Sequence, residues 1–546
     1  MQPELRVLGV TRMEVLPLAR LPKQPNFEHL RKQAKDLLRL YEANDAAAFE
    51  RFRQYLPAAA EKDDAAIAAM ALKLHDAQSC IAREYGLPNW QNLRNYIDFL
   101  NSRFSKERKH TAPLWLHGVY GHDGDHPQPT LAARVLADNP DLIQDDLYLA
   151  CAAGEEKVVR QAIAADPACV HRSASQWRCP GCNKILAMPP LIAVTHSTLI
   201  QLPEFRDRLL RCARLLLDAG ADVNQPFVDG EHTLSPLYGA AGKNQNAEMT
   251  KLLLDAGANP EDGESLYHSM EEHGRDCARL LLEAGAKIEG TNALHHCLDQ
   301  DDIEKLKLLL SYTKDANDSG SGLGSPLLWA IRRGRSRAHM ETLLAAGADP
   351  HARTKDGVSA YGLALQMGLA DIAELLAAAG AGEPLSVEEN FVAACARCDE
   401  REARRILSEY PNMFDRLSAP QLRQLPNLTE AGNKDAVRLM VRLGWPTAVT
   451  GGDWKASALN LAVYQGDADL TRFLLENGAS WTERQGFDDN VHGTLCWASR
   501  NMDPANDYVG CARALIDHGL PILELDGDYS EEVAEFIESE RKRLGA

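Results

Sequence analysis

A short phrase that ends in glycine recurs along most of the chain, and this repetition constrains the fold more than any other feature. It reads LLLDAGADVN at 215–224 and returns, less exactly each time, in copies that begin at 252, 280, 343, 375 and 474. Weaker copies lie at 136–139, 163–166, 308–313, 406–410, 439–446 and 515–521. The interval is about 33 residues, so the sequence predicts a stack of similar units in which each unit contacts mainly its neighbours.

A second phrase comes before most copies of the first and marks another helix in each unit. It reads SPLYGAA at 235–241, SPLLWAI at 325–331 and SALNLAV at 457–463. The leading Ser suits a helix N-cap and Pro suits the first helical turn, while the glycine of the first phrase suits a left-handed C-cap. The two phrases together resemble the ankyrin signature T-P-L-H-x-A. This resemblance implies an all-α fold, an ankyrin-repeat α-solenoid of about 12 helix–turn–helix units.

The segments outside the period suggest how the chain is divided. We expect a flexible N-terminus at 1–25, an N-terminal helical cap domain at 26–105, the ankyrin-repeat array at 130–525 with an insertion at 171–208, and a C-terminal capping helix at 528–546. The string DAQSCIAREYGLPNW at 76–90 resembles the N-terminal helical region of a group of bacterial ankyrin-repeat proteins. That resemblance implies a fold and hardly any particular activity.

The charge balance argues against two classes of partner. The chain has 59 Lys and Arg against 78 Asp and Glu, a net charge of −19. Since nucleic acids and anionic membrane surfaces are bound by clustered cations, we expect neither as the main partner. No apolar run approaches the roughly 18–20 residues of a membrane span, and the N-terminus does not resemble a signal peptide. Twelve cysteines without a framework spacing are typical of reduced thiols, which favours a cytoplasmic location.

Two segments have residue types that bind metals. Cys179 and Cys182 form a CPGC motif, which is half of a structural zinc site, a redox pair, or a plain turn with two thiols. Further zinc ligands would have to come from Cys169, His171 or His196. The second segment, 117–126, contains three histidines and two aspartates, which suit either a divalent metal or a solvated turn.

A third group of residues lies in the middle of the array, at 267–273. His268 and Glu272 are four residues apart and share a helix face, with Glu271 beside them and His296 one unit later. One interpretation is a histidine that packs between helices. The other is a hydrolase-type acid–base site formed by His268, Glu271, Glu272 and His296, which requires a pocket and a raised carboxyl pKa. The chain lacks GxSxG, GxxxxGK[ST] and strand-flanked GxGxxG motifs.

Counting from the second phrase identifies the residues that should line the concave groove of the array. They are His196, Lys243, Asn244, Glu271, Glu272, Asp299, Gln300, Arg332 and Arg333. A groove with charges of both signs can set the register of a protein partner. The sequence therefore favours a non-enzymatic protein-interaction scaffold, with loss of binding expected when Arg332 and Arg333 become Glu. The alternatives are the hydrolase and a zinc-stabilised scaffold.

Overall fold

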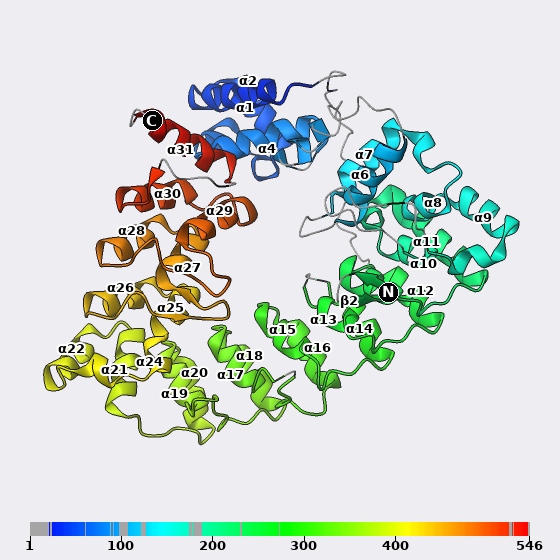
Figure 1. Ribbon diagram of the computed structural model, residues 1–546. Helices are drawn as coiled ribbons and strands as arrows, with labels where there is room; N and C mark the ends of the chain where they lie inside the picture. The colour runs from blue at the N-terminus through cyan, green and yellow to red at the C-terminus, as the bar shows by residue number, and fades with distance from the viewer. Residues whose placement is uncertain are drawn as a thin grey trace, which may run out of the picture. The chain divides into compact units, whose positions relative to one another are not determined.

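The chain is helical almost throughout the part that is described (Figure 1). Strands occur there as two short antiparallel ribbons, β1 (Phe227–Asp229) with β2 (His232–Leu234), and β3 (Thr450–Gly451) with β4 (Ala456–Ser457). None of the described helices combines the length and the apolar composition that crossing a bilayer requires. The computed structural model describes residues 21, 25–60, 62–87, 89–90, 92–94, 96–97, 108–121, 127–173, 177, 188–229, 232–271, 274–320, 322–522, 527 and 529–543.

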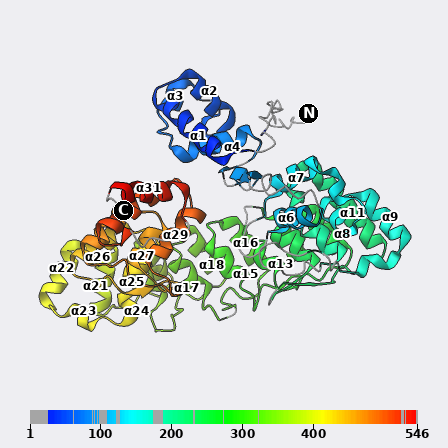
Figure 2. The same ribbon diagram turned by 45° about the horizontal axis from the view of Figure 1, so that its top comes forward.

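By internal contact the chain divides into two compact units, unit 1 (Met1–Pro236) and unit 2 (Leu237–Ala546). Within unit 1, helices α1 (Phe27–Glu42), α2 (Ala46–Tyr55), α3 (Asp64–Ala68) and α4 (Leu74–Glu84) pack into a bundle (Figure 2). The apolar residues of α1 recur at intervals of three or four and are buried. The Tyr41 hydroxyl donates a hydrogen bond to the carbonyl of Ile67, 3.0 Å away. The expected helices between 26 and 84 are therefore present, whereas the N-terminus at 1–25 lies almost entirely outside the described residues.

Three helix pairs follow in unit 1. They are α6 (Arg108–Tyr120) with α7 (Pro129–Asp138), α8 (Leu147–Ala153) with α9 (Glu156–Ala165), and α10 (Pro190–Thr195) with α11 (Pro203–Asp218). Gly154 caps α8 at φ +68°, and a Cβ atom there would lie 2.9 Å from the backbone nitrogen of Leu209. This position therefore needs glycine. Two details differ from the expected boundaries: the first pair begins before residue 130, and the insertion expected at 171–208 includes α10 and the start of α11.

Unit 2 contains nine helix pairs in its described residues, stacked in sequence order (Figure 1). We call the first helix of a pair inner and the second outer. The pairs are η5 (Tyr238–Lys243, a π-helical turn) and α12 (Ala247–Asp255); α13 (Ser265–His268) and α14 (Asp276–Glu283); α15 (Ala293–Asp299) and α16 (Ile303–Tyr312); α17 (Pro326–Arg332) and α18 (Arg337–Ala345); α19 (Ala360–Gln366) and α20 (Ala370–Ala378); α21 (Val387–Ala396) and α22 (Glu400–Glu409); α25 (Gln424–Glu430) and α26 (Lys434–Arg442); α27 (Ala458–Tyr464) and α28 (Ala468–Glu476); α29 (Val491–Asn501) and α30 (Tyr508–Asp517).

The weak copies of the first phrase at 308–313 and 406–410 mark the ends of α16 and α22, so the sequence correctly predicted that these units exist. At the C-terminal end, α31 (Glu531–Arg543) packs against α30. The guanidinium of Arg513 lies 4.7 Å from the ring centre of Phe536. Val533 and Ile537 of α31 are buried in the same core, as expected of a helix that covers the last pair.

The array is irregular at the α21/α22 pair. Two short helices, α23 (Met413–Arg416) and α24 (Ala419–Leu422), separate this pair from the next. Helix α21 packs against α19 and α26, while Gln424 of α25 reaches Gln366 of α19 directly, at 3.5 Å. The inner helices α19 and α25 thus approach each other although a whole pair lies between them in sequence.

An aromatic cluster holds this irregular region together. The ring of Phe391 stacks on Trp445 with centres 6.0 Å apart and meets Phe414 edge-on at 5.7 Å. Phe391 is fully buried, and the Trp445 indole donates a hydrogen bond to the carbonyl of Leu422. The cluster therefore links α21 to the segment that carries α23 and α24.

We predict that Phe391→Ala lowers the free energy of unfolding of unit 2 by about 3–5 kcal/mol, because it leaves a cavity that rigid neighbours fill only partly. Urea denaturation followed by tryptophan fluorescence measures this change. Phe391→Leu is the matched control and should cost clearly less. Equal stability of the Ala variant and the unsubstituted protein would contradict the role given to this cluster.

Candidate functional site

The inner helices of unit 2 present side chains three residues apart at their C-terminal ends. The first three such pairs are His268 at the end of α13 with Glu271 just after it, His296 with Asp299 in α15, and Trp329 with Arg332 in α17. Residues three apart lie on one face of a helix. Since consecutive helix pairs stack in the same register, these side chains form a continuous surface from pair to pair, which we call the inner-helix surface.

The residues of the predicted mid-array site bind one another on this surface. His268 Nδ1 lies 2.6 Å from Glu271 Oε1, and His268 Nε2 lies 3.2 Å from Glu264 Oε2. Across the next pair, Glu271 Oε1 is 3.8 Å from His296 Nε2, and the His296 ring stacks on Tyr267 with centres 4.1 Å apart. Each histidine is thus held between carboxylates.

The network continues through Asp299. This carboxylate lies 3.6 Å from His296 Nδ1 and accepts hydrogen bonds from Trp329 Nε1 at 2.9 Å and from Arg333 Nε at 2.7 Å. The guanidinium groups of Arg332 and Arg333 each lie 4.7 Å from the centre of the Trp329 ring, within the range of a cation–π interaction. Negative and positive groups therefore alternate along three consecutive pairs.

Both arginines are paired with a carboxylate that lies far away in the sequence. Asp453, between β3 and β4, accepts hydrogen bonds at 2.5 Å from Arg332 Nη2 and from Arg333 Nη2. Glu430 of α25 lies 3.9 Å from Arg333. Gly452 has φ +69°, in the left-handed region that favours glycine. We call the contacts of Arg332 and Arg333 with Asp453 the clasp.

The pKa values follow from this pairing. The hydrogen bond with His268 and the nearby His296 ring lower the pKa of Glu271 to about 2. The bond to Glu271 raises the pKa of His268. Burial lowers the pKa of His296, but Asp299 and Glu271 outweigh it and raise the pKa to about 9. At neutral pH His296 is therefore charged and Glu271 is ionised.

This arrangement does not favour the hydrolase hypothesis. A general acid needs a carboxyl pKa raised toward neutrality, whereas that of Glu271 is lowered. Glu272 and His273 lie outside the described residues. The His268, Glu271 and His296 side chains instead neutralise one another, and they form a structural contact between helix pairs.

The other residues expected in the groove are less exposed than the sequence suggested. His196 and Asn244 are buried, and Lys243 is half-buried. Cys179, Cys182 and the histidines at 122–126 lie outside the described residues, so the zinc hypothesis stays a prediction there. Within the described ranges, no three His, Cys, Asp or Glu side chains come together as a metal site.

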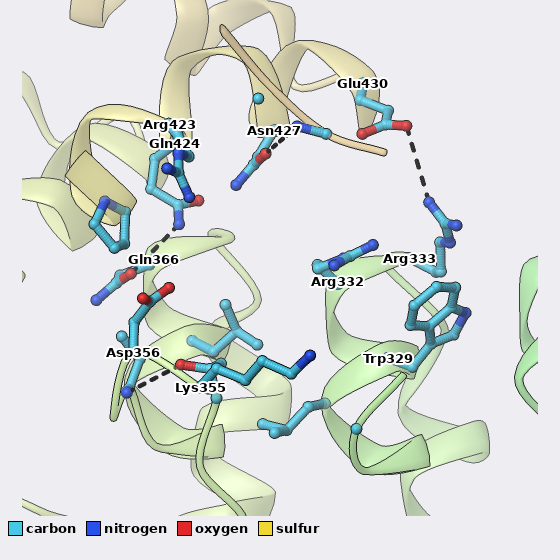
Figure 3. A pocket seen from close by; sticks show the side chains of 18 of the residues that line it. Trp329, Arg332, Arg333, Lys355, Asp356, Gln366, Arg423, Gln424, Asn427 and Glu430 are labelled. Carbon is cyan, nitrogen blue, oxygen red and sulfur yellow. Dashed lines mark hydrogen bonds and ion pairs between the residues drawn. The ribbon is translucent and has the colours of Figure 1, made fainter. Parts of the chain in front are cut away.

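The structure also contains a cavity that the sequence did not indicate. It has a volume of about 540 Å³ and is lined from α17, α19, α25, the β3–β4 ribbon and the loop at 353–358 (Figure 3). Arg332 and Lys355 reach into it from the side of α17 and α19. Arg423, directly before α25, and Asn427 of α25 face them. Of the predicted residues, only Arg332 and Arg333 line it. The signal in the sequence was the glycine pair of GGDWK at 451–455, which lets the ribbon reach α25.

A partly exposed aromatic row lies next to the clasp. Trp454 packs on Tyr464 with ring centres 5.1 Å apart, and Tyr464 stacks on Trp497 at 5.9 Å with the planes 9° apart. Trp497 is 53% exposed. Phe487 is 79% exposed and follows Gly486, whose amide donates to the carbonyl of Trp454. We call Trp454, Tyr464 and Trp497 the aromatic row. The repeat pattern of the sequence does not reveal it.

Comparison with known proteins agrees with this architecture. Residues 205–292 and 237–320 match the family model for ankyrin repeats in three copies. The chain therefore contains ankyrin repeats, and its fold is the all-α solenoid that such repeats form. A crystal structure of the human ASB11 ankyrin repeat domain is 20% identical, and the match covers 42% of this chain and 98% of that chain at a TM-score of 0.20. No curated protein matches the chain.

The two arginines of the clasp should differ in their contribution to stability. Arg333 contacts Asp299, Asp453 and Trp329, so Arg333→Met should lower the free energy of unfolding by roughly 2 kcal/mol. Arg332 is more exposed and has Asp453 as its one carboxylate partner among the described residues, so Arg332→Met should cost less than about 1 kcal/mol. Urea denaturation at low and high salt compares the two. Equal costs would show that the contact with Asp299 adds nothing.

The histidine network predicts how stability depends on pH. His296 gains its proton more readily in the folded state, so its contribution is complete below its unfolded pKa of about 6.5 and is lost as the pH rises through about 9. Glu271 contributes above its unfolded pKa of about 4.3 and loses this as the pH falls toward 2. Urea midpoints measured from pH 5 to 9.5 should fall above pH 6.5, and less so in His296→Asn. The same fall in both proteins would contradict this assignment.

Proposed function

We propose that this protein is a cytoplasmic, bacterial scaffold that binds a partner protein through the inner-helix surface of unit 2. Ankyrin repeats generally serve as protein-interaction modules, and solenoids bind partners along such extended surfaces. Each of the ten cysteines in the described residues is a free thiol, which supports a reducing compartment. The observation that carries the proposal is the partly exposed aromatic row.

The aromatic row has the composition of an interaction hot spot. Tryptophan and tyrosine dominate binding energy at protein interfaces, where a few residues account for most of it. Here they stack on one another, so their rings are oriented before a partner arrives, which reduces the entropy lost on binding. Phe487 on the neighbouring loop adds apolar surface. The row thus offers a partner a firm surface that is partly exposed, with Trp497 as its most accessible ring.

The proposal changes the role expected of the charged residues. Glu271 is paired with His268 and His296, and Arg333 is paired with Asp299 and Asp453. The main effect of these charges is therefore to fix the surface. Changing Arg332 and Arg333 to Glu would also break the clasp. The double change therefore does not separate lost contact with a partner from a disturbed fold, and the aromatic row gives a cleaner test.

We predict that Trp497→Ala weakens partner binding about 30-fold, the equivalent of about 2 kcal/mol for a hot-spot residue, with little change in thermal stability because the side chain is half exposed. The partner is first recovered by pull-down from the native host and mass spectrometry. Its affinity for each variant is then measured by biolayer interferometry.

The matched control is Tyr312→Ala. Tyr312 is also exposed, at the end of the outer helix α16, and its removal should leave the affinity unchanged. If Trp497→Ala and Phe487→Ala both bind the partner as tightly as the unsubstituted protein does, the docking surface lies elsewhere and the proposal is wrong.

A further inference from the structure

The cavity beside the clasp has an excess of positive charge, which the proposed binding of a partner at the aromatic row does not explain. Its lining contains six cationic side chains, Arg332, Arg333, Arg353, Lys355, Arg423 and Lys455, and two acidic ones, Asp356 and Glu430. The whole chain has a net charge of −19. This local excess of positive charge therefore runs against the composition of the protein.

Half of these cations are not used within the protein. Arg353 pairs with Glu383, and Arg332 and Arg333 pair with Asp453. Lys355, Arg423 and Lys455 have no ion-pair partner in the described part of the chain. Burial and the nearby Asp453 raise the pKa of Glu430, and this carboxyl group lies 3.9 Å from Arg333. The cavity thus has three cations available for an anionic ligand.

Two buried amides in the lining have unused hydrogen-bonding capacity. Gln366 and Gln424 are 1% and 4% exposed, and they share one long bond of 3.5 Å. Gln366 Nε2 and Gln424 Oε1 have no partner among the described residues, and neither has the hydroxyl oxygen of Ser325. Rotating one amide would place two oxygens or two nitrogens together, and rotating both leaves one donor and one acceptor unused again. Buried polar groups are normally paired, so this pair is suited to a ligand with both an acceptor and a donor.

The rest of the lining limits the size of such a ligand and favours an apolar central part. Leu323, Leu328, Val358, Leu363 and Pro420 provide an apolar wall. A volume of about 540 Å³ lies in the range of small-molecule sites, which are typically apolar clefts with a few convergent polar groups. No lining residue belongs to α21, since α19 and α25 meet directly and the ribbon at 450–455 covers the space beside them.

We propose that this cavity binds a small organic anion with two or three negative charges, as carboxylates or a phosphate ester, on a short body that also has a hydroxyl or amide group. Lys355, Arg423 and Lys455 neutralise the anion, and Gln366 and Gln424 pair with the polar group of the body. Lys355 belongs to the α17–α19 side and Arg423 to the α25 side, so one anion bridges both and stabilises their contact. This site is separate from the aromatic row and does not depend on the proposed protein partner.

The test measures thermal stability and isothermal titration calorimetry at constant ionic strength, with three probes: citrate, glycerol 3-phosphate and hexaglutamate. We expect citrate or glycerol 3-phosphate to bind with a Kd below about 1 mM and to raise the melting temperature, as a ligand of the folded state does. Binding of citrate alone or of glycerol 3-phosphate alone tells carboxylate from phosphate.

Variants locate the bound anion. Lys355→Met and Arg423→Met should each weaken binding at least tenfold, while Arg401→Met, which removes an exposed cation on α22 outside the cavity, should not change it. The double variant Gln366→Met and Gln424→Met should also bind at least tenfold more weakly, and yet it should unfold at the same or a higher temperature because it removes unpaired buried polar groups. Trp497→Ala should bind the probes normally.

Three results would overturn the proposal. They are no binding of either small anion up to 10 mM, binding that Lys355→Met and Arg423→Met leave unchanged, and binding of hexaglutamate alone. The last result would assign the cavity to an acidic protein segment. If Trp497→Ala no longer binds the protein partner but still binds the probes, the two proposals are shown to concern separate sites.

Discussion

The whole structure depends on one constraint: a single helix pair is too small to bury its own apolar face, so each pair has to stack on the next. Stacking in a fixed register places the ends of the inner helices side by side. For this reason Glu271 of one pair meets His296 of the next, and Asp299 meets Trp329 and Arg333. The polar network is a consequence of the repeat, and its charges are balanced because the register leaves little room between them. A balanced network holds neighbouring pairs in line, but it has few charges left for a partner.

Repetition also explains which parts of the structure the sequence could predict. A period of about 33 residues located the helix pairs, including α16 and α22, whose phrases lack the closing glycine. Counting from the second phrase placed Glu271, Asp299 and Arg332 at equivalent positions of three successive units. These are local or nearest-neighbour relations, and such relations are visible in a sequence when each unit resembles the next.

What the sequence could not predict arises where the repetition fails. Asp453 reaches Arg332 and Arg333 from more than a hundred residues away, because the α21/α22 pair and the short helices after it interrupt the regular stacking and let α19 meet α25. No local pattern encodes such a contact. The cavity has the same origin, as its lining comes from segments that are not consecutive pairs. The lowered pKa of Glu271 could not be predicted either. A histidine and a glutamate close together in a sequence do not reveal whether they activate or neutralise each other.

The difference between paired and unpaired charges separates structure from function in unit 2. Where opposite charges meet at 2.5–3.9 Å, as at Asp299, Arg333 and Asp453, removal of one partner is felt mainly as a loss of stability. Lys355, Arg423 and Lys455 form no ion pair within the described residues, and the buried Gln366 and Gln424 leave hydrogen bonds unmade. A sequence optimised for stability alone would replace these five residues. Their convergence on one cavity is therefore best explained by a ligand. In the bound state the ligand would supply the ion pairs and hydrogen bonds that these residues lack in the free protein.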